Sequence, residues 1–177
     1  MIAYEPLGPF ELYKRFKAGD DKAFKQLYDL FGPGLFNYIV RLVTDWHHAE
    51  DILVETFTKL AQSNLDDRGS LKAWLYRVAT NQCYRWFRNN KEIQISEELL
   101  CQHMNEPMID KTKEIKIQKF LNILPGHQKM VIILKFFDGM NYQEIADILC
   151  IPVGTVKSRI HEGLQKLREK VRRFYEM

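Results

Sequence analysis

The chain has 177 residues, of which 46% are hydrophobic and 28% are charged, and its formal net charge is +3. This length suits one medium domain or two small ones with modest cores, and the small net charge excludes a uniformly polycationic chain. The N-terminus lacks the charged-then-apolar pattern of a signal peptide, and no apolar run approaches the ~18 residues that cross a bilayer. We therefore predict a cytoplasmic protein without membrane insertion.

Charge is distributed unevenly along the chain. Residues 68–91 contain six Lys/Arg and no acid, whereas residues 92–114 contain six acids and two lysines. Residues 155–177 contain seven Lys/Arg against three Glu. Two basic blocks separated by an acidic stretch indicate two nucleic-acid-facing surfaces on separate modules.

The sequence carries no pattern typical of a catalytic or metal site. The three cysteines (Cys83, Cys101 and Cys150) are widely spaced and form no CxxC pair. His47 and His48 are adjacent and would point to different sides of a helix, which makes a poor metal pair. Phosphate-binding glycine loops and GxSxG elbows are absent. We expect no metal, no cofactor, no small-molecule substrate and no enzymatic activity.

Helical periodicity begins near residue 20 and continues to Leu42. Either Asp20 or Asp21 can cap the start of this helix. The triplet Gly32-Pro33-Gly34 should kink or interrupt this helix, because proline lacks an amide donor and clashes with the preceding turn.

Two further helices follow in the first half. One runs from about Trp46 to Ser63, with Leu53, Phe57, Leu60 and Ala61 on one face. Residues 64–69 form a polar loop, and Ser70 caps the next helix. The inward residues of that helix are Leu71, Trp74, Leu75 and Val78.

The second half is predicted to be a separate helical unit. Residues 89–111 are polar and acidic and contain Pro107, which indicates a linker. Short helices follow over 113–124, after Pro125, over 142–149 and over 153–174. The fold class is therefore all-α, with an N-terminal helical bundle (1–91), a flexible linker (92–112) and a C-terminal helix-turn-helix domain (113–177).

Residues 141–170 have the layout of a helix-turn-helix. The first helix has Ile145, Ala146 and Leu149 on its inner face, and the second has an apolar stripe of Val156, Ile160, Leu164, Leu167 and Val171. Polar side chains remain on the outer side of the second helix near its start, where this motif contacts the DNA major groove. They are Thr155, Lys157, Ser158, Arg159, His161 and Glu162. Arg159 or Lys157 could pair with guanine or with phosphate. The alternative is a basic amphipathic helix that faces water.

At this point a family resemblance becomes specific. The segments LPGHQKMV (124–131), FDGMNYQEIA (137–146) and PVGTVKSR (152–159) resemble the C-terminal domain of extracytoplasmic-function sigma factors, members of the sigma-70 family. That resemblance implies recognition of the promoter −35 element. Cys150 departs from the pattern, because the family usually places glycine in this turn, and a left-handed backbone costs cysteine about 1 kcal/mol more than glycine.

The segment AEDILVETF (49–57) resembles the family segment that docks on core RNA polymerase. The outer side of this helix is acidic with one apolar residue, which suits a partner helix better than DNA. We predict polymerase contacts there from Glu50, Asp51, Val54, Glu55 and Thr58. Val54 stands where the family commonly has glutamine, and a solvated acidic face is the alternative.

The segment SLKAWLYRVATN (70–81) resembles the helix that handles the promoter −10 element. Arginines can hold the phosphates of the melted strand, and Tyr84 can stack on an unpaired base. The loop over 64–69 matches the region that receives a flipped base, whose extrusion costs a few kcal/mol. The predicted −10 residues are Asn64, Arg77, Asn81, Tyr84, Arg85 and Arg88. The alternative for Arg77 and Asn81 is a structural role in which they bridge helices within the domain.

The resemblance covers about residues 20–91 and 113–173 and implies a sigma factor that directs core RNA polymerase to promoter DNA. It also implies an anti-sigma factor as a further partner. The rival hypothesis is a conventional helix-turn-helix regulator that binds duplex sites without acting as a sigma subunit. A third is an interaction protein whose basic patches contact an acidic partner.

Overall fold

The computed structural model describes residues 7–67, 69–89 and 111–175, and every regular element within these ranges is an α-helix. The all-α fold class is confirmed. The N-terminal module comprises four helices: α1 (Pro9–Lys17), α2 (Asp21–Val43), α3 (Trp46–Gln62) and α4 (Leu71–Asn89). The C-terminal module comprises α6 (Lys111–Asn122), α7 (Gly126–Phe136), α8 (Tyr142–Leu149) and α9 (Val153–Tyr175). Residues 92–110 of the predicted linker (92–112) lie outside the described residues.

Helices α2 and α4 of the N-terminal module begin at side-chain caps that the sequence indicates. Asp20 accepts hydrogen bonds from the amides of Lys22 and Ala23 at the start of α2. Ser70 accepts one from the amide of Ala73 at 3.2 Å, which confirms the predicted cap of α4. The inward faces of α2, α3 and α4 form a core of fully buried aliphatic side chains. They are Leu27, Leu35, Ile39, Leu42, Leu60 and Leu75.

Helix α2 runs through Pro33 without interruption, so the alternative of a broken helix is wrong. The flanking glycines allow aromatic rings to approach closely. A Cβ atom at Gly32 would lie 3.4 Å from the Tyr28 ring, and one at Gly34 would lie 3.1 Å from the Tyr76 hydroxyl. Burial along the helix outweighs the lost proline hydrogen bond, because tertiary packing supplies most of the stability of such helices.

Helix α1 was not predicted. It starts at Pro9, a residue favoured in the first helical turn, and buries Leu12 and Tyr13 against the rest of the module. The Tyr13 hydroxyl donates to the Ser63 carbonyl at 2.7 Å and accepts from the Leu65 amide at 3.1 Å. Helix α1 therefore fixes the backbone on both sides of Asn64.

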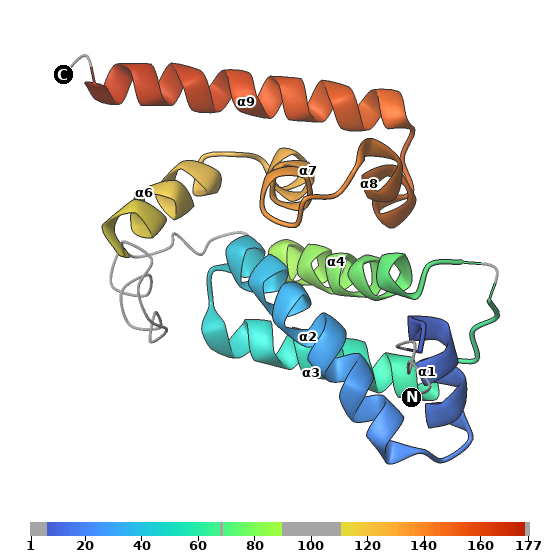
Figure 1. Cartoon of the computed structure of the whole chain (residues 1–177). Coiled ribbons are helices and arrows are strands. Elements are labelled where there is room, and N and C mark those ends of the chain that lie inside the picture. Colours follow the sequence, from blue (N-terminus) through green and yellow to red (C-terminus); the bar gives the residue numbers. More distant parts are fainter. Residues whose placement is uncertain (1–6, 68, 90–110, 176–177) are drawn as a thin grey trace, which may run out of the picture.

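Helix α7 is the centre of the C-terminal module. Its residues from Gln128 to Leu134 are all buried, as expected for a helix enclosed on every side. It packs against α8 and α9 of its own module and against α2 of the N-terminal module. Figure 1 shows α7 between α9 and the N-terminal helices, with α8 beside α4. The two modules therefore form one closed body in this structure.

Candidate nucleic-acid interface

The helix-turn-helix is shaped by a capping box at Asn141 and by one left-handed residue, Cys150. Asn141 accepts from the Gln143 and Glu144 amides, and the Glu144 carboxylate accepts from the Asn141 amide at 2.7 Å, which completes a capping box. Helix α8 ends at Cys150, whose φ of 53° and ψ of 45° are left-handed. The chain then turns at Ile151, whose amide donates to the Ala146 carbonyl, and α9 begins at Val153.

The predicted −35 residues all lie in the first turns of α9. Four of them are exposed (Lys157, Ser158, His161 and Glu162), and Thr155 and Arg159 are half-buried. Glu162 also has a local structural contact, because its carboxylate accepts from the buried Gln128 amide nitrogen at 3.0 Å. The exposed group fits a nucleic-acid surface, and its contacts with DNA stay a prediction.

The predicted apolar stripe of α9 is only partly correct. Val156 and Ile160 are buried, whereas the side chain of Leu164 is 37% exposed. Gly163 takes the inward position instead, where a Cβ atom would lie 2.6 Å from Ile132 Cδ1. The close approach of α9 to α7 leaves no room for a side chain there, and Leu164 is consequently turned outward.

The predicted −10 residues lie on α4 and the loop before it. Asn64, Asn81, Tyr84, Arg85 and Arg88 are exposed, and Arg77 is half-buried. The stripe is directed toward the C-terminal module, since Arg77 donates through Nη2 to the carbonyl of Asp147 in α8. Burial raises the pKa of Tyr84, and the nearby positive charge of Arg159 partly offsets this rise. A predicted −10 residue, Tyr84, and a predicted −35 residue, Arg159, therefore lie close enough to interact.

The predicted polymerase-docking side of α3 faces away from the core. All five of its residues, Glu50, Asp51, Val54, Glu55 and Thr58, are exposed. The Val54 side chain is 65% exposed, which is the largest exposed fraction among the described large hydrophobic residues. Glu55 pairs with Lys59 at 2.8 Å and lies 4.0 Å from Arg85 of α4. The acidic face of α3 and the basic helix α4, which carries the predicted −10 residues, are thus adjacent.

Two titratable residues at the module interface escaped the sequence analysis. Burial lowers the pKa of Lys129 to about 7, with nearby Cys83 acting in the opposite direction. Burial also raises the pKa of Asp138 to about 6, while Lys72, the Tyr76 hydroxyl and Arg41 lower it. Lys129 directly precedes an apolar run, MVIIL, and that position is the only signal in the sequence that it is buried.

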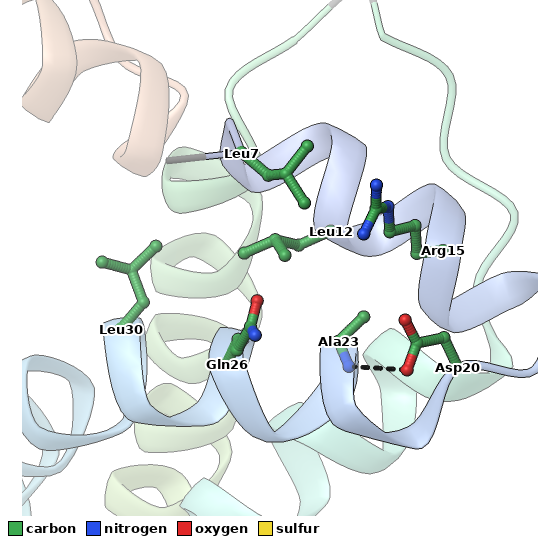
Figure 2. Close-up of a pocket in the computed structure, with 7 residues that line it drawn as sticks. All are labelled: Leu7, Leu12, Arg15, Asp20, Ala23, Gln26 and Leu30. Carbon is green, nitrogen blue, oxygen red and sulfur yellow. Dashed lines mark hydrogen bonds between the residues drawn. The ribbon is translucent and has the colours of Figure 1, made fainter. Parts of the chain in front are cut away.

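A cavity of about 430 Å³ lies between α1 and α2, bordered by Leu7, Leu12 and Leu30 and by the polar side chains of Arg15, Asp20 and Gln26 (Figure 2). Asp20 already accepts the Ala23 amide there, so its carboxylate serves the start of α2. Within the described ranges, no helix is long and apolar enough to cross a membrane.

Comparison with known proteins matches both modules. The family described as Sigma-70 region 2 matches residues 27–93, and the family described as Sigma-70, region 4 matches residues 114–167. The chain is 32% identical to the ECF RNA polymerase sigma factor SigW of Bacillus subtilis (strain 168), with 90% of this chain and 94% of SigW covered. It is 28% identical to SigX of the same strain, with 84% of each protein covered.

Two solved structures share the fold. CnrH in complex with the cytosolic domain of CnrY superimposes with a TM-score of 0.71 at 21% identity, covering 90% of this chain and 94% of that chain. The sigma factor RpoE in complex with the anti-sigma factor NepR from Bartonella quintana superimposes with a TM-score of 0.68 at 27% identity. That match covers 85% of this chain and 98% of that chain.

Proposed function

Because the chain belongs to the extracytoplasmic-function sigma factors of the sigma-70 family, we propose that its two helical modules divide promoter recognition between them. As a sigma factor, the protein directs core RNA polymerase to specific promoters and assists melting of the −10 element. The observation that supports separate roles for the modules is the pair of family matches. The N-terminal module matches Sigma-70 region 2, and the C-terminal module matches Sigma-70, region 4.

The C-terminal module, residues 113–177, reads the −35 element as duplex DNA. Lys157, Ser158, His161 and Glu162 are exposed at the start of α9, the part of a recognition helix that enters the major groove. Arg159 is placed to donate to a guanine edge or to a phosphate once the modules separate. Thr155, in the first turn of α9, is the remaining residue of the proposed −35 contact surface.

The N-terminal module, residues 1–91, holds the melted −10 strand. Arg77, Arg85 and Arg88 supply positive charge along α4 for the phosphates, and Tyr84 offers a ring for stacking on an unpaired base. Asn81 lies between them on the same face, and Asn64 lies in the loop that Tyr13 fixes. A flipped base would be received by that loop.

The outer side of α3 binds core polymerase. Its acidic residues surround the exposed Val54, which gives a partner helix both charge complementarity and an apolar contact. Residues 92–112 act as the linker between the module that holds the −10 element and the module that reads the −35 element.

Three further properties follow from the same proposal. The protein acts in the cytoplasm, where core polymerase works, and serves as an initiation factor that catalyses no reaction of its own. It is also regulated by an anti-sigma factor, since RpoE, which shares its fold, was solved in complex with one.

In vitro transcription with purified core polymerase and a library of linear promoter fragments tests the proposal. Promoter-specific RNA should require both components and should report the −10 and −35 sequences. Arg159→Ala should reduce initiation at −35-dependent promoters about tenfold or more, because a good base or phosphate contact contributes about 1–3 kcal/mol. Glu50→Lys and Val54→Asp should weaken binding to core polymerase.

Matched controls separate these contacts from general damage. Asp29→Lys reverses an exposed charge on α2, and Lys170→Ala removes an exposed charge far along α9. Both should transcribe like the wild type. Unchanged transcription in all three interface variants would contradict the site assignments. Tight duplex binding by the protein alone, without RNA, would favour a conventional regulator.

A further inference from the structure

The side chain of Lys129 crosses the interface between the two modules. It is only 4% exposed, and its Nζ donates to the carbonyl of Leu42 at 2.9 Å and to Asn122 Oδ1 at 2.8 Å. Leu42 is the next-to-last residue of α2, so its carbonyl has no partner within its own helix. A residue of the C-terminal module therefore caps a helix of the N-terminal module.

A second donor completes this cap. The Gln118 side chain of α6 donates to the carbonyl of Arg41 at 2.9 Å and to Asn122 Oδ1 at 3.1 Å. Asn122 thus holds both donors in place from within the C-terminal module. Lysine side chains at helix C-termini satisfy exposed carbonyls and interact favourably with the helix dipole. Both donors act on main-chain carbonyls in the last turn of α2.

Side-chain contacts lie around the cap. The Arg41 guanidinium lies 4.3 Å from the centre of the Phe137 ring, which is the range of a cation–π contact. The Tyr76 hydroxyl reaches Asp138 Oδ1 at 3.5 Å, and the Phe87 ring packs beside Gly126. Each contact joins one module to the other, and Lys129 is buried among them.

The closed arrangement engages both predicted DNA faces. Arg77 is held by the Asp147 carbonyl of α8, in the helix that precedes the recognition helix. Tyr84 of the −10 face interacts with the charge of Arg159 of the −35 face. A promoter presents its two elements at separate places along the DNA, so both faces can be used together only when the modules part.

We propose that Lys129 is a latch: by capping α2 it holds the free chain closed, an arrangement in which the −10 and −35 faces cannot engage the two separated promoter elements together. The inhibitory part of this proposal rests on the site assignments proposed above, whereas the latch itself rests on the contacts alone. Binding of core polymerase and promoter DNA then selects the open arrangement.

Small-angle X-ray scattering of the full-length chain tests the latch directly. Lys129→Glu would place a carboxylate against the carbonyl end of α2, so the closed arrangement should be lost and the radius of gyration should rise. The carbonyl that Lys129 caps belongs to the N-terminal module, so the helical circular dichroism of the chain should be kept. Lys116→Glu, an equal charge reversal at an exposed position of α6, should stay as compact as the wild type.

A binding assay without polymerase tests the inhibition. The probe is a fork-junction DNA that carries the promoter found by in vitro transcription. The Lys129→Glu variant should bind it at least about fivefold more tightly than the wild type, because the apparent dissociation constant is divided by the fraction of competent protein. An open variant with unchanged DNA affinity would overturn the inhibitory role.

Phe137→Ala provides a second variant in case Lys129→Glu does not fold. Phe137 is partly exposed and contacts Arg41 across the interface, so its truncation should shift the radius of gyration in the same direction. Folded variants at both positions that remain as compact as the wild type would overturn the latch. The scattering result is independent of transcription, so a failure of the proposed function would appear separately, as absence of promoter RNA from the wild type.

Discussion

Cys150 occupies the tightest point of the helix-turn-helix. It is one of two described non-glycine residues with a positive φ, the other being Thr44. The sequence analysis noted that the family usually has glycine at this position, and the structure shows the left-handed backbone that glycine would favour. A left-handed conformation costs an L-residue about 1–2 kcal/mol, because its Cβ atom approaches the carbonyl oxygen. The chain accepts this cost at the turn that orients the recognition helix.

Replacement of this residue by glycine should therefore stabilise the protein. Cys150→Gly should raise the free energy of unfolding by about 0.5–1 kcal/mol, since the relief of strain exceeds the added entropy of the unfolded chain. Urea denaturation followed by circular dichroism measures the change. Cys150→Ala removes the thiol but keeps the strained backbone and should give no gain. Equal stabilisation by both substitutions would contradict the strain argument.

At the scale of the helix, the contact between α7 and α9 depends on the absence of a side chain. Gly163 lies opposite Ile132, and Gly154 lies on the same helix with nothing within 4 Å of an added Cβ atom. The two glycines therefore have different roles although the sequence presents both alike. Gly163 allows two helices to approach, whereas Gly154 lies in open space at the start of α9.

A matched pair of substitutions distinguishes these roles. Gly163→Leu should force α9 away from α7 and lower the free energy of unfolding by more than about 1 kcal/mol, as overpacked cores do. Gly154→Leu should leave stability unchanged or raise it slightly, because leucine favours a helix more than glycine does. Thermal denaturation of both variants beside the wild type measures the difference. Equal losses would show that the contact tolerates a side chain.

Helices that depend on local signals were predicted well. Asn141 and Ser70 mark helix starts with their own side chains, and α8 begins and ends at the predicted residues 142–149. Helix α1 was missed because its short apolar face becomes meaningful only when Tyr13 meets the loop after α3. The uninterrupted course of α2 through Pro33 likewise depends on packing that the local sequence does not reveal.

The whole molecule depends on contacts between distant segments, which the sequence analysis could not supply. Periodicity placed the predicted DNA and polymerase residues on outer helix faces, and most of them are exposed in the structure. The burial of Lys129 and the hydrogen bond of Arg77 to α8 depend on residues about 70 or more positions away. No local pattern carries that information.

The closed arrangement should depend on pH through Lys129. Its pKa is lowered by burial to about 7, and the Cys83 thiol beside it, with a pKa raised to about 12, stays neutral. In the open state Lys129 returns toward the ordinary value of 10.5 and so binds more protons than in the closed state between about pH 7 and 10. Raising the pH through this range therefore favours closure.

Scattering measurements between pH 7 and 9.5 test this linkage. The population ratio of closed to open chain should increase by up to roughly tenfold per pH unit, and the radius of gyration should fall. Lys129→Met, which has no titratable group, should show a flat profile over the same range. Asp138, whose raised pKa of about 6 lies below this range, does not interfere. A wild-type profile as flat as that of Lys129→Met would exclude Lys129 as the source.

The cap on α2 has a consequence for exchange of modules between related proteins. Lys129 and Gln118 both donate to main-chain carbonyls, so what they recognise is the end of a helix rather than particular side chains. A foreign N-terminal module could be accepted with different residues at positions 41 and 42, provided that its helix ends at the same place. One inserted residue within α2 would rotate those carbonyls by about 100° and remove the fit. Compatibility of the two modules is thus set by the length of a helix more than by its composition.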